Sequence, residues 1–295
     1  MRVSVIGGGA IGLLVSYFLQ SNGNEPVIYT RTIEQAENIK KSGLTYVNMK
    51  GYKATFSVEV KPIETFKGDE PFSVIAVKQT AIKELNKLKA LSEVSCLFLQ
   101  NGISHLSFID NLPNNQVCVG VVEHGALKEG YSTVHHLGEG RIKLSSYRGD
   151  SLHDWETLLN SECFPIQSET NWEKMLFEKL IMNASINPLT AILKLTNGEL
   201  LSNEHAFRLM KRLFEETITA LNMADRQDEL WKELLILCRN TSLNRSSMLK
   251  SVESGQQTEI DSITGEIINR ANLKSIQIPY SRFVYEAVKA LDQRG

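Results

Sequence analysis

A glycine-rich loop between a predicted strand and a predicted helix constrains the fold of this chain more than any other feature. Residues 3–6 form a short apolar run typical of a buried strand, and residues 7–12 follow as GGGAIG, which matches GxGxxG. Apolar residues then recur at helical spacing up to residue 19, and residues 26–30 indicate the next strand. In such a unit, glycines let the backbone approach a pyrophosphate, and the helix N-terminus supplies N–H donors. The pattern therefore predicts a dinucleotide-binding domain.

The residues after the second predicted strand indicate which dinucleotide the loop holds. NAD-selective folds usually place an acid there to bind the ribose 2′-hydroxyl, whereas an arginine suits the 2′-phosphate of NADP. Here Arg31 follows the strand, and the first acid is Glu34. Arg31 therefore predicts that the cofactor is NADP rather than NAD. The alternative is a surface arginine near a helix start.

Strand and helix patterns alternate as far as residue 167. Strands are predicted at 72–77, 94–99, 117–122 and 164–166, with two or three short ones within 44–60, a hairpin at 133–145, and helices at 81–91 and 155–159. Lys78 and Asn101 follow two of the strands, at the edge where parallel sheets bind ligands. Turn residues are an equal alternative for both.

The sequence after residue 167 is nearly all helical in pattern. Helices are predicted at 172–194, 204–223, 229–238 and 260–272. We therefore expect an α/β Rossmann-type domain over residues 1–167, followed by an all-α domain over residues 168–295.

One apolar helical stretch, residues 178–200, contains an unusual polar row. Lys179, Asn183 and Asn187 follow one another at a spacing of four, so a helix places them on one face. Asn is unfavourable inside helices because its side chain competes for backbone hydrogen bonds. The row is a solvent-facing stripe, or a set of helix-end caps at Asn187–Pro188, or the lining of a polar pocket in which Lys179 donates a proton.

Residues 258–261, TEID, are predicted to open the helix at 260–272. Thr258 and Asp261 resemble a capping box, which places Glu259 in the first turn. Acids favour helix N-termini through the helix dipole, and this is the simpler explanation of Glu259 when the residue is considered alone.

Composition excludes several other functions. The formal net charge is -2 with no basic block, which does not suggest nucleic-acid binding. The four cysteines form no CxxC pair, so we expect neither a zinc site nor a disulfide framework, and a cytoplasmic location. The apolar N-terminus is interrupted by three glycines, so we expect no membrane span and no signal peptide. His135 and His136 are expected to be exposed strand residues rather than metal ligands.

Several motifs together resemble the ketopantoate reductase family along essentially the whole chain. These are GGGAIG at the start, AVK ending at Lys78, QNG at Asn101, EKLIMNASINPLTA followed by TNGEL, and SSML followed by TEID. The resemblance implies a Rossmann domain, a helical domain and an active site between them. It also implies the NADPH-dependent reduction of ketopantoate (2-dehydropantoate) to (R)-pantoate, on the route to pantothenate and coenzyme A.

The resemblance also assigns roles to individual residues. Lys179 matches the catalytic lysine and Glu259 the active-site glutamate. The positions that match substrate contacts are Asn101, Asn183, Asn187, Asn197 and Ser247. The positions that match cofactor contacts are Gly7, Gly8, Gly9, Ala10, Ile11, Gly12, Arg31, Lys78, Asn101 and Glu259. No metal is implied, and a homodimer is a candidate assembly.

Two alternatives remain open at this point. One is a reductase of the same fold that uses NADPH on another branched 2-keto acid. The other is a sensor that binds NADPH without catalysis, although a sensor needs neither Lys179 nor Glu259.

Overall fold

The computed structural model describes residues 1–293 and divides into two compact units. The first unit contains Met1–Gln100 and His105–Met175, and the second contains Asn101–Ser104 and the chain from Leu176 onward. The boundary predicted at residues 167–168 falls inside the last strand of the first unit. The first residues of the following helix stay with the first unit, where the rings of Trp172 and Tyr147 lie 4.6 Å apart.

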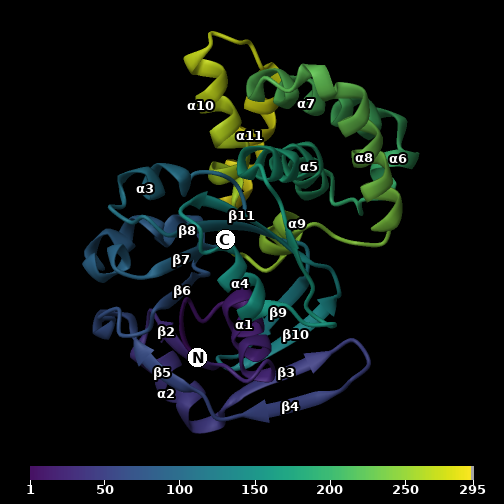
Figure 1. The fold of residues 1–295 in the computed structure, drawn as a ribbon. Coiled ribbons are helices and arrows are strands. Elements are labelled where there is room, and N and C mark those ends of the chain that lie inside the picture. Colours follow the sequence, from purple (N-terminus) through teal and green to yellow (C-terminus); the bar gives the residue numbers. More distant parts are fainter. Residues whose placement is uncertain (294–295) are drawn as a thin grey trace. The chain divides into compact units, whose positions relative to one another are not determined.

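An eight-stranded sheet forms the body of the first unit (Figure 1). Its strand order is β12-β11-β8-β7-β6-β1-β2-β5, and the six strands from β8 to β5 are all parallel. The strands are β1 (Arg2–Ile6), β2 (Glu25–Thr30), β5 (Glu59–Pro62), β6 (Phe72–Ile75), β7 (Ser95–Phe98), β8 (Val117–Val122), β11 (Ile142–Arg148) and β12 (Ile166–Ser168). The six parallel strands have the order of a dinucleotide-binding sheet, in which β1 and β6 flank the point where the strand order reverses.

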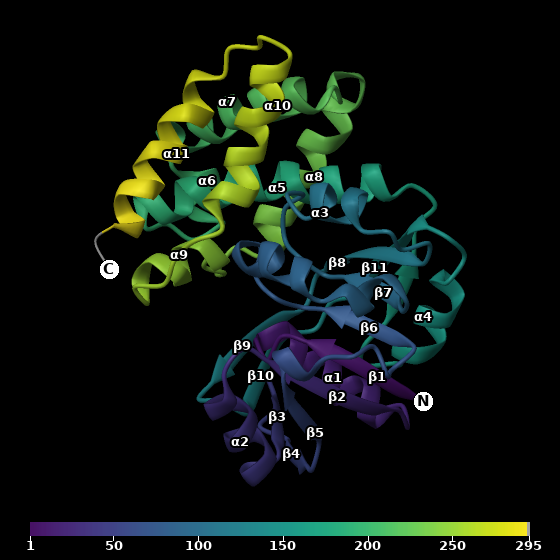
Figure 2. The ribbon, with the colours of Figure 1, turned by 90° about the vertical axis from the view of Figure 1, so that its left-hand side faces the viewer.

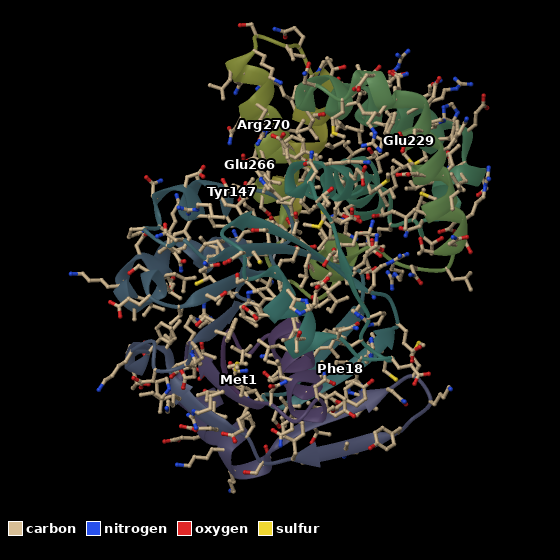
Figure 3. The ribbon with its side chains drawn as sticks, viewed as in Figure 1. Met1, Phe18, Tyr147, Glu229, Glu266 and Arg270 are labelled. Carbon is tan, nitrogen blue, oxygen red and sulfur yellow. The ribbon has the colours of Figure 1, made fainter. Side chains whose placement is uncertain are left out.

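A second, four-stranded sheet has the order β4-β3-β10-β9. Its strands are β3 (Leu44–Asn48), β4 (Lys53–Phe56), β9 (Gly125–Glu129) and β10 (Thr133–Gly138). The helix α1 (Ala10–Ser21) contacts both sheets, because it packs on β1 and β2 and also on β3, β9 and β10. Phe18, labelled in Figure 3, lies in this core and stacks on Phe164 with ring centres 4.2 Å apart.

The hairpin predicted at residues 133–145 is wrong. β10 pairs with β3 and β9 in the small sheet, whereas β11 pairs with β8 and β12 in the large one. A period of two shows that a segment is a strand, but it does not show which strand is its partner. Gly138 and Gly140 therefore mark the passage from one sheet to the other rather than a tight turn.

The remaining helices of the first unit are short. They are α2 (Ile33–Ser42), α3 (Leu106–Asn111) and α4 (Leu152–Leu159), with 3₁₀ turns at Ile63–Thr65, Gln79–Lys87 and Lys89–Ser92. The helix predicted at residues 81–91 is present as two 3₁₀ helices that meet at Leu88, rather than as one continuous α-helix. Only Ile82, Leu85 and Leu91 are buried there, so little packing favours a longer α-helix.

The second unit is helical, as Figure 2 shows. The helix α7 (Glu204–Leu221) packs against α6, α8, α10 and α11. The other helices are α5 (Trp172–Leu193), α6 (Glu199–Ser202), α8 (Gln227–Asn240), α9 (Ser247–Glu253), α10 (Glu266–Leu273) and α11 (Pro279–Asp292), with a 3₁₀ turn at Ala224–Arg226 and a π-helix at Asp261–Gly265. Within residues 1–293, no helix combines the length and the apolar character needed to cross a bilayer.

Candidate functional site

The glycine loop joins β1 to α1, and internal contacts explain only some of its glycines. Gly7 has a φ of +119°, and a Cβ there would lie 2.8 Å from the Ala76 carbonyl oxygen. A Cβ on Gly12 would collide with the Gly7 carbonyl oxygen. Gly9 has an ordinary φ of -82°, and the nearest heavy atom to a Cβ there would be 4.0 Å away. No contact among residues 1–293 thus requires glycine at position 9, which fits the close approach of a ligand from outside.

The N-terminus of α1 offers backbone donors at the same place. Gly9 is the N-cap and provides no side chain to cap the helix. The first bond of the helix runs from the Leu13 N–H to the Gly9 carbonyl at 2.9 Å, so the earlier N–H groups of the turn have no partner within the helix. Together with the helix dipole they form an anion site suited to a pyrophosphate.

Arg31 and Lys78 follow two strands of the large sheet. Arg31 comes directly after β2, is exposed, and forms no ion pair with any of residues 1–293. Lys78 lies beyond β6, is exposed, and begins the 3₁₀ turn Gln79–Lys87. Both cations therefore have the exposure that contact with a phosphate requires.

In the second unit, α5 carries Lys179, Asn183 and Asn187 on one face as predicted from their spacing. Lys179 and Asn183 are half-buried, and Asn187 is 7% exposed. The alternative of a helix end at Asn187–Pro188 is wrong, because α5 continues through Pro188 to Leu193. The row is thus a mostly buried polar stripe on a continuous helix, rather than a solvent-facing one.

Glu259 lies next to Asn101. The Asn101 Nδ2 donates a hydrogen bond to the Glu259 Oε2 at 3.3 Å, and both residues belong to the second unit. A second bond nearby runs from the Ser104 Oγ to the Glu266 Oε1 at 3.0 Å. Glu266 is labelled in Figure 3. The structure therefore brings the QNG and TEID motifs into direct contact.

The Thr258 Oγ1 accepts from the Ile260 N–H at 3.4 Å, but the predicted reciprocal box with Asp261 does not form, because residues of α11 bind both side chains. The Thr258 Oγ1 donates to Asp292 at 2.8 Å, and Asp261 accepts from the Tyr285 hydroxyl at 2.7 Å and from the Lys289 Nζ at 3.0 Å. The turn after Glu259 is a π-helix instead of an ordinary first turn. Single π-turns within helices occur frequently at functional sites.

Asn197 lies in a loop, and Ser247 is the first residue of α9. The Asn197 Nδ2 donates to the Thr241 Oγ1 at 2.9 Å, so this amide holds the loop between α8 and α9. Ser247 is exposed in the first turn of α9, whereas the preceding Ser246 caps the helix and accepts from the Thr190 Oγ1 at 2.7 Å. The sequence did not indicate Ser104, Glu266 or Ser246, since each makes its contact with a distant segment.

His136 is buried, so the prediction of an exposed strand residue is wrong for it. The Gly140 N–H donates to the His124 Nδ1 at 3.2 Å, so His136 Nε2 must donate to the same nitrogen, at 3.0 Å. The Tyr46 hydroxyl then donates to the His136 Nδ1 at 2.9 Å. Burial lowers the pKa of His124 to about 4, which keeps the pair neutral. In the described part of the chain, no group of three or more His, Cys, Asp or Glu could hold a metal ion.

Comparisons with known proteins match this arrangement over the whole chain. Residues 3–149 match the family model described as ketopantoate reductase PanE/ApbA, and residues 171–292 match the model of its C-terminal region. A curated 2-dehydropantoate 2-reductase from Bacillus subtilis (strain 168) is 36% identical, and the match covers 99% of this chain and 98% of the relative. A 2-dehydropantoate 2-reductase from Listeria innocua is 31% identical, and the match covers 99% of this chain and 97% of that relative.

A solved structure agrees with these sequence matches. The crystal structure named a probable 2-dehydropantoate 2-reductase, panE, from Bacillus subtilis superimposes with a TM-score of 0.90 and 34% identity, and the match covers 99% of this chain and 100% of that one. The predicted fold class and enzyme class are confirmed. By its sequence and by its fold, the chain belongs to the ketopantoate reductase family.

Proposed function

We propose that the protein reduces 2-dehydropantoate to (R)-pantoate with NADPH, a step on the route to pantothenate and coenzyme A. The observation that carries the proposal is the match to 2-dehydropantoate 2-reductases over 99% of the chain. The contact between Asn101 and Glu259 supports it, because two of the motifs that carry the resemblance meet there.

NADPH is the proposed form of the cofactor. The N–H groups at the start of α1 would bind the pyrophosphate, and the open side of Gly9 would admit it. Arg31 is exposed directly after β2, where a guanidinium can bind a 2′-phosphate through two parallel hydrogen bonds. Lys78 would add a second cation on the cofactor side.

Lys179 is the proposed general acid. When bound, the reduced nicotinamide supplies the hydride that adds to the ketone carbon of the substrate. Negative charge then develops on the ketone oxygen, where the Lys179 ammonium would stabilise it and donate the proton. A half-buried position on α5 suits this role, because partial exclusion of water strengthens the interaction between the two charges.

The amide side chains would hold the substrate. Asn183 and Asn187 share the face of Lys179, and Asn101 is held by Glu259. Amides and the Ser247 hydroxyl can bind a carboxylate and a hydroxyl without adding net charge. Asn197 has the least support for such a role, because its Nδ2 is already bonded to Thr241.

The test is the rate of NADPH oxidation by purified protein with a panel of 2-keto acids. We expect the highest kcat/KM with 2-dehydropantoate, and a much lower value with branched 2-keto acids that lack its hydroxyl group. A preference for another member of the panel would transfer the proposal to that substrate. NADPH binding without turnover of any 2-keto acid in the panel would favour a sensor. Light scattering on the same sample would test whether the protein is a homodimer.

A further inference from the structure

A side chain of α2 is hydrogen-bonded to the glycine loop. The Gln35 Nε2, on the first turn of α2, donates to the Gly8 carbonyl oxygen at 2.7 Å and to the Tyr131 carbonyl oxygen at 3.2 Å. Both partners are acceptors, so the amide orientation follows from the contacts, and both N–H groups of the amide are used. Thr32 fixes the start of α2, because its hydroxyl accepts from the Gln35 N–H at 3.3 Å.

A side chain at the middle glycine of the loop would displace this amide. A Cβ on Gly8 would lie 2.7 Å from the Gln35 Nε2, closer than real Cβ atoms approach a nitrogen. The GxGxxG pattern leaves this position unspecified, so phosphate binding alone does not require glycine there. Gly8 and Gln35 are instead a matched pair, in which the absent side chain makes room for the amide.

The direction of the bond determines where the next N–H group points. The peptide between Gly8 and Gly9 is planar and trans, so its N–H points opposite to its carbonyl. Gln35 binds that carbonyl, which turns the Gly9 N–H away from α2. The Gly9 N–H is one of the donors at the N-terminus of α1. We propose that Gln35 is a positioning residue for the dinucleotide, because it fixes the peptide whose N–H faces the pyrophosphate.

The inference rests on the proposal that the loop binds NADPH, and it makes a distinct statement about kinetics. Gln35 would act on the ground-state binding of the cofactor, since its side chain bonds the Gly8 carbonyl of the loop and the Tyr131 carbonyl. Its loss should therefore raise the KM for NADPH and leave kcat at saturating NADPH unchanged. A role in folding alone would lower the melting temperature and leave NADPH affinity unchanged.

The experiment measures NADPH binding by fluorescence titration, and steady-state kinetics, on Gln35→Met, Gly8→Ala and the double variant Gly8→Ala/Gln35→Met. Met keeps the length of Gln but lacks its donors, and we expect NADPH to bind about tenfold more weakly, as for the loss of one well-formed hydrogen bond. Gly8→Ala should cause a similar loss by displacing the amide. The double variant should be no weaker than the single variants, because both changes break the same contact.

The matched control is Asn38→Ala. Asn38 lies on the same helix, and its amide also donates to a backbone carbonyl, that of Glu34 at 2.8 Å, but it has no bond to the loop. Its NADPH affinity should equal that of the wild type. Undiminished NADPH binding by Gln35→Met, or fully additive losses in the double variant, would overturn the inference. Wild-type protein that binds neither NADPH nor NADH would overturn the proposed function as well.

Discussion

Replacement of Lys179 by alanine tests the proposed chemistry most directly. Lys179 lies within the 22-residue helix α5 and is half-buried, and alanine is the best helix former, so we expect stability to change by less than about 1 kcal/mol. General acid catalysis contributes roughly 10²–10⁴-fold, which corresponds to about 3–5 kcal/mol of the activation barrier. We therefore expect kcat to fall by about this factor in a protein that melts normally. NADPH binding should persist, since the glycine loop belongs to the other unit.

The assay is single-turnover hydride transfer, combined with a fluorescence titration of NADPH on the same preparation. Lys179→Arg should recover only part of the rate, because a guanidinium stays charged and is a poor proton donor near neutral pH. Lys211→Ala, an exposed lysine on α7, is the control and should behave as the wild type. Near-normal hydride transfer by Lys179→Ala would refute the reasoning, because another group would then be the acid.

Three further predictions concern the cofactor, the substrate and pH. Arg31→Ala should weaken NADPH binding about tenfold or more and leave NADH binding almost unchanged, since a charge-assisted phosphate contact contributes about 1.5–3 kcal/mol; equal losses for both would contradict the assignment. Alanine at Asn101, Asn183 or Ser247 should raise the KM for 2-dehydropantoate with the fold retained, whereas lower melting temperatures with unaltered kinetics would identify structural residues. Burial lowers the pKa of His105 from 6.5 to about 3, so between these pH values the unfolded chain binds one proton that the folded chain does not. The melting temperature should therefore decrease as the pH is lowered from 6.5 toward 3. His105→Gln should reduce that slope in calorimetry, and an unchanged slope would mean that His105 does not cause it.

Local patterns in the sequence sufficed for most of the first unit. The glycine loop and the two strands of its βαβ unit, β1 and β2, depend on short-range signals that the structure reproduces. The pairing of strands could not be predicted from local patterns: β10 and β11 are adjacent in sequence but belong to different sheets. The burial of His136 could not be predicted locally either, because it depends on the packing of α1 against the small sheet rather than on the sequence of its own strand.

The candidate site was predictable where residues share one helix and less so where they do not. The spacing of Lys179, Asn183 and Asn187 is enough by itself to place them on a common face of α5. Thr258 and Asp261 satisfied the local rule for a capping box, yet Asp292 and other groups of α11 bind these side chains instead. Contacts between distant segments can override local capping preferences, and no single-sequence pattern reports them.

The discontinuous make-up of the second unit has a consequence for synthesis of the chain. Asn101 is 158 residues away from Glu259 in sequence, and Ser104 is 162 residues away from Glu266. On the ribosome, all strands through β12 emerge before Glu259 and Glu266 are synthesised. The two contacts of Asn101 and Ser104 with these acids can therefore form only near the end of translation. A chain that stops after Met175 would contain every strand of the large sheet and neither acid. Expression of the helical unit alone, from Leu176, would conversely lack the short segment, Asn101–Ser104, that its acids bind.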